Sequence, residues 1–248
     1  MKIKVNFLTF VLAFVVSITG MYKEFLIIFS IVIFHEFGHF LMGKICGWNF
    51  IEIEIYPYGG CVKFSERLNR KIIEEILILI SGPFFQILFY LFILFLYKNN
   101  LLLDRDFLMF KNYHYTLLVF NLLPIYPLDG GRIINLFLQY MFPYKVSNFI
   151  TIIISFIMVL ISSLFYRDMN YIFMLVMLIY EEFVYLKRQD YLLNKLMLER
   201  YLYKYKFNRR IKVDSESMFY KERYHYLKFF DTYISEDMYL YKKYGGRL

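Results

Sequence analysis

The sequence predicts an all-α polytopic membrane protein with about six transmembrane helices, a short membrane-associated β-hairpin and a broken fourth span. Long apolar blocks, one alternating segment, and prolines and glycines inside an apolar region support this prediction. Of the 248 residues, 59% are hydrophobic and 22% are aromatic. A soluble domain of this length would need a more polar surface than such a composition provides.

The apolar residues gather in blocks close to the length that crosses about 30 Å of hydrocarbon. The blocks are Val5–Gly20, Phe25–Cys46, Ile76–Tyr97, Tyr113–Met141, Phe149–Tyr166 and the weaker Tyr171–Leu186. Glu181 and Glu182 interrupt the sixth block and are expected at the membrane interface. The first block could be read as a signal peptide, but no small-residue cleavage site follows it, so a retained helix is expected.

Two segments depart from simple spanning helices. Asn49–Tyr58 alternates apolar and polar residues, and Gly59-Gly60 then separates it from Cys61–Phe64, which predicts a hairpin. In the fourth block, Asn121–Arg132 holds two prolines and two glycines, so the helix should break there. A broken helix at membrane depth requires a cavity or a protein partner beside it.

The charge distribution predicts the topology and the domain division. Residues 187–248 carry 15 Lys/Arg and 8 Asp/Glu, which gives them a net charge of +7 within a total of +8. Because basic flanks stay cytoplasmic, we expect a multi-pass protein with both termini in the cytoplasm. We assign 1–186 to a transmembrane domain and 187–248 to a basic, tyrosine-rich cytoplasmic tail. The tail's first part reads either as an amphipathic helix on lipid or as the start of a small solvated domain.

The chemistry centres on the run His35-Glu36-Phe37-Gly38-His39. Residues four apart on a helix project from one face, so both imidazoles can reach one tetrahedral zinc ion. Glu36 lies beside them and can act as general base toward a water molecule that the ion activates. A purely structural role would require three costly polar groups in one apolar span, where ionisable residues are usually functional.

A catalytic zinc site needs a third protein ligand and an open position. Asp129 is the leading candidate because it sits at the proline-glycine break, where an aspartate is costly unless it is paired. Glu52 and Glu54 are the rivals, although they share the face that a strand turns to solvent. Asn121 could either donate to a substrate carbonyl or cap a half-helix. His114 and His225 are expected to be ordinary surface or interface residues.

With these residues assembled, the chain resembles the site-2 protease family of intramembrane zinc metalloproteases. The resemblance rests on His35–His39 and on Asn121–Gly130, and it extends over about Ile31–Ile134. It implies that His35, His39 and Asp129 bind one Zn²⁺ per chain and that Glu36 is the general base. The Gly59-Gly60 hairpin and Ser81-Gly82-Pro83 also look like family features, whereas Gln86 stands where the family often has Asn.

Within that family, the compact form without an inserted PDZ domain resembles the stage IV sporulation protease group. This resemblance implies cleavage of a sigma-factor precursor at the membrane that surrounds the forespore. The expected partners are a membrane-associated protein substrate, the lipid bilayer and regulatory membrane proteins, with no nucleic acid. Two alternatives remain open: a housekeeping protease for signal-peptide remnants or anti-sigma factors, and a non-enzymatic metal-stabilised scaffold or transporter. A transporter should show two similar halves, which the sequence lacks.

Overall fold

The computed structural model describes residues 2–5, 18, 20, 22–56, 59–64, 67–165 and 169–245. The chain divides into two compact units, residues 1–66 with 76–121 and residues 67–75 with 122–248. The predicted first span, Val5–Gly20, lies almost entirely outside the described residues, so the expected retained helix is not tested.

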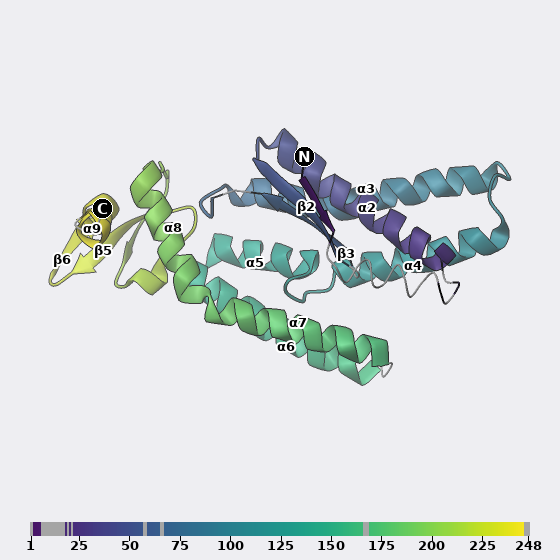
Figure 1. Ribbon diagram of the computed structural model, residues 1–248. Helices are drawn as coiled ribbons and strands as arrows, with labels where there is room; N and C mark the ends of the chain where they lie inside the picture. The colour runs from purple at the N-terminus through teal and green to yellow at the C-terminus, as the bar shows by residue number, and fades with distance from the viewer. Residues whose placement is uncertain are drawn as a thin grey trace. The chain divides into compact units, whose positions relative to one another are not determined.

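The first unit combines helices with a small sheet (Figure 1). Its elements are β1 (Lys2–Val5), α2 (Tyr22–Ile45), β2 (Phe50–Tyr56), β3 (Gly59–Phe64), most of α3 (Ile72–Lys98) and α4 (Asp104–Asn121). β2 pairs antiparallel with β3 and parallel with β1. The predicted hairpin is therefore confirmed, but the glycine pair opens β3 and does not form the turn, since Gly59 already pairs with Tyr56.

The core of the first unit forms where α2, α3 and α4 meet. Ile31, Phe89 and Phe110 are buried together there, one from each helix. The Phe89 and Phe110 rings meet edge to face with centroids 5.4 Å apart. This arrangement favours the ring quadrupoles and fixes α4 against α3. The result is a rigid support for the part of α2 that carries the two histidines.

The second unit begins with helices and ends with a small mixed sheet (Figure 1). Its elements are α5 (Asp129–Met141), α6 (Tyr144–Phe165), α7 (Met169–Lys187), α8 (Gln189–Tyr203), β4 (Arg210–Val213), the 3₁₀ turn η1 (Glu216–Met218), β5 (Tyr224–Phe229), β6 (Thr232–Ser235) and α9 (Glu236–Tyr244). α6 and α7 lie side by side.

The fourth apolar block breaks as expected, because α4 ends at Asn121 and α5 begins at Asp129. The backbone between them is hydrogen-bonded to a neighbouring helix. The N–H of Tyr126 donates to the Ser155 hydroxyl at 2.8 Å, and that hydroxyl donates in turn to the Glu182 carboxylate. These bonds satisfy polar groups that an apolar environment would otherwise leave at a cost. Glu182 is therefore buried against Ser155, whereas the sequence had suggested an interfacial residue.

Amide side chains join α5 to α6 inside the second unit. Asn135 donates to Asn148 at 3.0 Å and to Thr151 at 2.8 Å, and Asn148 donates to Gln189 at 2.7 Å. All four of these side chains are buried. Because buried amides need partners, this seam fixes the register of α5 against α6.

Part of the predicted set of six spans is present among the described residues. Among the described residues, three helices are long and apolar enough to cross a membrane, at Tyr22–Ile45, Ile72–Lys98 and Tyr144–Leu164. Six spans are not confirmed. The fourth block is divided between α4, whose first turn holds Asp104 and Asp106, and α5, whose 13 residues measure only about 20 Å.

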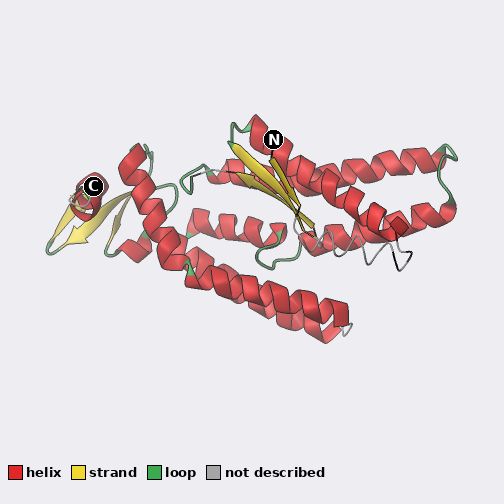
Figure 2. Ribbon diagram, viewed as in Figure 1, coloured by secondary structure: helices red, strands yellow, loops and turns green. Residues whose placement is uncertain are grey.

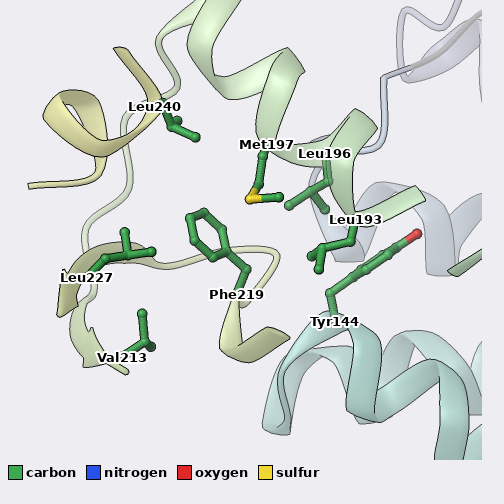
Figure 3. Packing of buried hydrophobic residues seen from close by; sticks show 8 residues of the cluster. All are labelled: Tyr144, Leu193, Leu196, Met197, Val213, Phe219, Leu227 and Leu240. Atoms are coloured by element: carbon green, nitrogen blue, oxygen red, sulfur yellow. The ribbon is translucent and has the colours of Figure 1, made fainter. Parts of the chain in front are cut away.

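The all-α expectation is wrong for the C-terminal residues, which contain a second three-stranded sheet of order β4-β5-β6 (Figure 2). Leu193, Leu196 and Met197 of α8 point into a hydrophobic cluster with Phe219 and Leu227 (Figure 3). The apolar side of α8 is thus covered by protein. The sequence left two interpretations of this segment, an amphipathic helix on lipid or the start of a small solvated domain. The structure favours the second, because α8 begins a small folded domain.

A buried ionic cluster stabilises this C-terminal sheet. Glu236, at the start of α9, accepts from Arg200 at 3.0 Å and from the His225 Nδ1 at 2.8 Å. The His225 Nε2 accepts from the Tyr220 N–H at 2.9 Å, so the neutral ring carries its proton on Nδ1. His225 is fully buried, which corrects the expectation of a surface residue.

The cluster makes the C-terminal sheet sensitive to acid. Burial lowers the pKa of His225 below its usual value, although Glu236 opposes that shift. Burial would raise the pKa of Glu236, but the His225 hydrogen bond and the Arg200 charge hold it below its usual range. Both groups therefore bind protons more readily in the unfolded chain than in the folded one. The contribution of His225 to folding stability is lost as the pH drops below about 6.5, and the contribution of Glu236 is lost as the pH falls further through the carboxyl range.

We expect amide exchange in Tyr224–Phe229 of the full chain, corrected for the intrinsic rate, to increase between pH 8 and pH 5.5. The His225→Gln variant should lose the part of this change that lies near pH 6.5, because glutamine does not titrate. Hydrogen exchange with mass spectrometry provides the measurement. An equal increase in the variant would contradict the assignment to His225.

Candidate metal centre

The two histidines of α2 converge on one point. His35 and His39 lie four residues apart, and both are buried. Their Nε2 atoms are 3.1 Å apart. Two nitrogens bound at about 2.05 Å to one tetrahedral ion would lie about 3.3 Å apart. The pair therefore has the spacing of two ligands of a single zinc ion.

The other nitrogen of each ring is held by a hydrogen-bond acceptor. The Nδ1 of His35 lies 3.0 Å from Oε1 of Gln86, and the Nδ1 of His39 lies 2.7 Å from the carbonyl oxygen of Ile78. Each Nδ1 must carry the proton for these bonds to form. With Nδ1 held in this way, each ring presents its Nε2 toward the other ring. Two imidazole nitrogens that converge on one point, each oriented by a hydrogen bond at its second nitrogen, form a donor set that fits a metal ion.

Gln86 is a positioning residue for this pair. Its side chain is fully buried, and its Nε2 donates to the carbonyl oxygen of His114 at 3.1 Å. That bond fixes the amide orientation and leaves Oε1 directed at His35. In the sequence, Gln86 stands out only because the family often has Asn at this position. The longer side chain still reaches His35 on α2, and its amide nitrogen is held by the His114 carbonyl oxygen on α4.

The Gln86→Leu variant should bind zinc about 10 to 100 times more weakly, the usual effect of removing a group that orients a metal-ligating histidine. Leucine keeps the volume but cannot accept from Nδ1. The dissociation constant can be measured in detergent by competition with a chelating dye. Leu88→Ala, on the exposed side of the same helix, should bind zinc as the wild type does. Unchanged affinity in Gln86→Leu would show that the amide does not orient His35.

Two glycines let α2 and α3 approach at the level of the histidines. A Cβ on Gly38 would lie 2.3 Å from the Ser81 carbonyl oxygen, which is a backbone clash. A Cβ on Gly82 would lie 2.4 Å from Nε2 of His39 and 2.8 Å from Nε2 of His35. The space beside Gly82 is thus the space into which both nitrogens point. In the sequence, Gly82 stood out only as part of Ser81-Gly82-Pro83, which looks like a feature of the site-2 protease family.

Glu36 lies beside the pair. One of its carboxylate oxygens and the ligand nitrogens of the two histidines all lie within 4.8 Å of one another. Adjacent residues diverge by about 100° around a helix, so Glu36 does not share the direction of the two imidazoles. The carboxylate is near enough to exchange a proton with a molecule that sits between the rings.

The remaining candidates lie in different parts of the chain. Asn121 is the last residue of α4 and is half-buried. Asp129 is the first residue of α5 in the second unit and is buried at the N-terminus of that helix, where the helix dipole favours a carboxylate. Glu52 and Glu54 belong to β2, and their side chains lie outside the described residues.

His114 is the second isolated histidine, and it is buried, which corrects the expectation of a surface residue. Its ring stacks on Tyr90 with centroids 4.6 Å apart. Its carbonyl oxygen accepts from Gln86, as described above. His114 therefore supports the site through its backbone, and no spacing in the sequence indicated this contribution.

The part of the chain that carries these residues matches a known protein family. The model of peptidase family M50 matches residues 23–103 and 100–165, which include both histidines, Glu36 and Asp129. Stage IV sporulation protein FB of Bacillus subtilis is 31% identical over 145 residues, or 58% of this chain and 50% of that protein. A zinc metalloprotease of Methanocaldococcus jannaschii is 31% identical over 166 residues, or 62% of this chain and 46% of that protein. The chain spans about half the length of these curated relatives.

Among solved structures, a site-2 protease from Methanocaldococcus jannaschii shares the fold. The TM-score is 0.51 at 23% identity, and the match covers 76% of this chain and 88% of that chain. The resemblance to site-2 proteases that the sequence indicated is confirmed by the family match, which covers more than half of the chain. The chain belongs to peptidase family M50.

Proposed function

We propose that this chain is an intramembrane zinc metalloprotease that hydrolyses a peptide bond in or near the membrane segment of a regulatory protein. The observation that carries the proposal is the convergence of the two Nε2 atoms, 3.1 Å apart, with Glu36 beside them. The membership in peptidase family M50 and the relative named as a zinc metalloprotease support it.

The residues have separate roles in the proposed reaction. His35 and His39 would hold the ion, and Asp129 is proposed as the third protein ligand. When bound, zinc polarises the scissile carbonyl and acidifies water. The Glu36 carboxylate takes a proton from the attacking water and delivers it to the leaving amine. Asn121 is proposed to donate its amide N–H to the substrate carbonyl as negative charge develops on that oxygen.

The proposed substrate is a membrane-associated sporulation regulator, specifically a sigma-factor precursor. The similarity to a stage IV sporulation protein supports this substrate class. The proposed location is the membrane around the forespore, with several spans and both termini in the cytoplasm. Co-expression of the chain with a tagged candidate precursor tests the assignment, since processing should convert the precursor to a shorter band. If signal-peptide remnants are cleaved and the precursor is not, the housekeeping alternative holds.

The Asp129→Ala variant tests the third ligand. If Asp129 binds the ion, the zinc content of the purified variant should fall well below about one per chain, because two histidines alone leave a catalytic site incomplete. Inductively coupled plasma mass spectrometry measures this content. Glu52→Ala and Glu54→Ala are the matched controls and should keep their zinc. Full zinc and full activity in Asp129→Ala would remove the residue from the site.

A further inference from the structure

A pocket of about 400 Å³ lies in the second unit, apart from the histidine pair. Its walls come from the residues just before α3, from the end of α5, from the segment after α8 and from the loop before β5. Four of the lining residues are basic: Lys71, Lys206, Arg209 and Arg223. Four others are aromatic: Tyr140, Tyr205, Phe207 and Tyr220.

Basic side chains outnumber acidic ones in the lining of the pocket by four to one. Within the part of the chain that the structure describes, none of its four basic side chains has a carboxylate oxygen within 4.0 Å. Glu222 is the one acidic lining residue, and it accepts from the Ile72 N–H at 2.7 Å, which caps the start of α3. Arg209 and Arg223 instead lie over the rings of Tyr140 and Tyr220, at 5.5 and 4.1 Å. The pocket is therefore an anion-attracting cavity with aromatic walls.

Buried Arg200 holds the walls of this pocket in place. Its guanidinium donates to the carbonyl oxygens of Tyr220, Lys221 and Arg223, at 2.7, 2.6 and 2.9 Å. It also donates to the Asn69 side chain at 2.7 Å and lies 4.3 Å from the centre of the Phe207 ring. Side chains that are fixed before binding lose little freedom when a ligand arrives. The backbone of the loop before β5 and the Phe207 ring are thus held by one buried side chain.

The pocket lies next to the start of α3, a helix that is long and apolar enough to cross a membrane. Asn69 and Lys71 line it, and the apolar helix α3 begins at Ile72. The 27 residues of α3 measure about 40 Å, which exceeds the ~30 Å hydrocarbon core. The first turn of α3 also contains Glu74 and Glu75, which belong among the headgroups. Basic pockets at this level are suited to anionic lipid headgroups.

We propose that this pocket binds a phosphate-bearing anionic ligand, with the headgroup of an anionic phospholipid as the source that its position favours. The basic side chains match the phosphate charge, and the aromatic walls match the less polar part of a headgroup. A cavity of this volume has the size of small-molecule sites. The proposal is independent of the protease chemistry.

Calorimetric titration of the full chain in a non-ionic detergent tests this proposal. Short-chain phosphatidylglycerol should bind at least about 10 times more tightly than short-chain phosphatidylcholine, since the latter carries no net charge. The double variant Lys206→Gln/Arg209→Gln should bind phosphatidylglycerol about 30 times more weakly, because each of the two basic residues contributes about 1 kcal/mol near an anionic lipid. Both side chains are exposed, so folding should be preserved, which the unfolding temperature without lipid checks.

The control variant Lys212→Gln/Lys228→Gln removes the same charge from exposed positions outside the pocket. Its affinity for phosphatidylglycerol should equal that of the wild type. Glycerol 3-phosphate separates the two sources, since binding as tight as that of the lipid would identify a soluble phosphate ester as the occupant. The pocket assignment would be overturned if neither phosphatidylglycerol nor glycerol 3-phosphate binds. It would also be overturned if the two double variants lose affinity for phosphatidylglycerol equally.

Discussion

The Glu36→Gln variant is expected to process a membrane-associated substrate at least about 100-fold more slowly than the wild type, the usual scale for losing a general base. Glutamine keeps the size and the hydrogen-bonding reach of glutamate but cannot take a proton at neutral pH. The zinc content should remain at the wild-type level, because the two imidazoles and Glu36 leave the helix in different directions. The ratio of processed to unprocessed precursor on a gel, followed over time, gives the rate.

The conservative Glu36→Asp variant is the matched control. It keeps a base but shortens its reach, so it should retain more activity than Glu36→Gln. Processing by Glu36→Gln at the wild-type rate would rule out the proposed mechanism. Loss of zinc together with activity would give Glu36 a structural role in place of the catalytic one.

The Gly82→Ala variant is expected to lose zinc almost completely. The added methyl group would lie 2.4 Å from Nε2 of His39 and 2.8 Å from Nε2 of His35, where a bound ion would otherwise sit. Alanine is the stronger helix former by about 1 kcal/mol, so the loss cannot be explained by a weaker α3. Metal analysis of the purified variant gives the zinc content, and proteolysis of the precursor should stop with it.

Phe84→Ala provides the comparison for Gly82→Ala. Phe84 lies two residues further along α3, and its side chain is exposed. This substitution should leave the zinc content unchanged. If Gly82→Ala binds zinc as well as Phe84→Ala does, the metal position inferred from the two Nε2 atoms is wrong.

Part of the site follows from spacing alone. His35 and His39 are four residues apart in an apolar block, and helical geometry brings such a pair to one face. The block itself is long enough to require a helix in a membrane. The helix break between Asn121 and Asp129 could also be predicted from the sequence, because each proline removes a backbone hydrogen-bond donor.

Other parts depend on tertiary contacts that leave no periodic signal. Gln86 and the carbonyl oxygen of Ile78 lie in α3, about 40 to 50 residues after the histidines that they orient. Only the packing of α2 on α3 brings these groups to the histidines. The position of Gly82 beside the two Nε2 atoms depends on the same packing. A single glutamine or glycine in an apolar span forms no pattern with other residues in the sequence. Its contribution to the site could therefore not be predicted.

The C-terminal sheet was missed for a different reason. β4 and β6 each contain only four residues. An alternation of apolar and polar residues over so short a length cannot be recognised within a basic, tyrosine-rich segment. The segment is stabilised instead by side chains distant in sequence, as in the contact between Arg200 and Glu236. The sequence alone does not distinguish buried charged residues such as Arg200 and Glu236 from exposed ones. The high charge of this segment therefore suggested a solvated tail.

X-ray absorption at the zinc edge of the purified full chain tests the metal centre most directly. The proposed centre predicts zinc bound by two imidazole nitrogens at about 2.0–2.1 Å, with the remaining ligands oxygen atoms at about 2.0–2.2 Å. The His39→Ala variant should lose this signal together with the metal. A first shell dominated by sulfur at about 2.3 Å, or an unchanged spectrum in His39→Ala, would contradict a zinc centre built on His35 and His39.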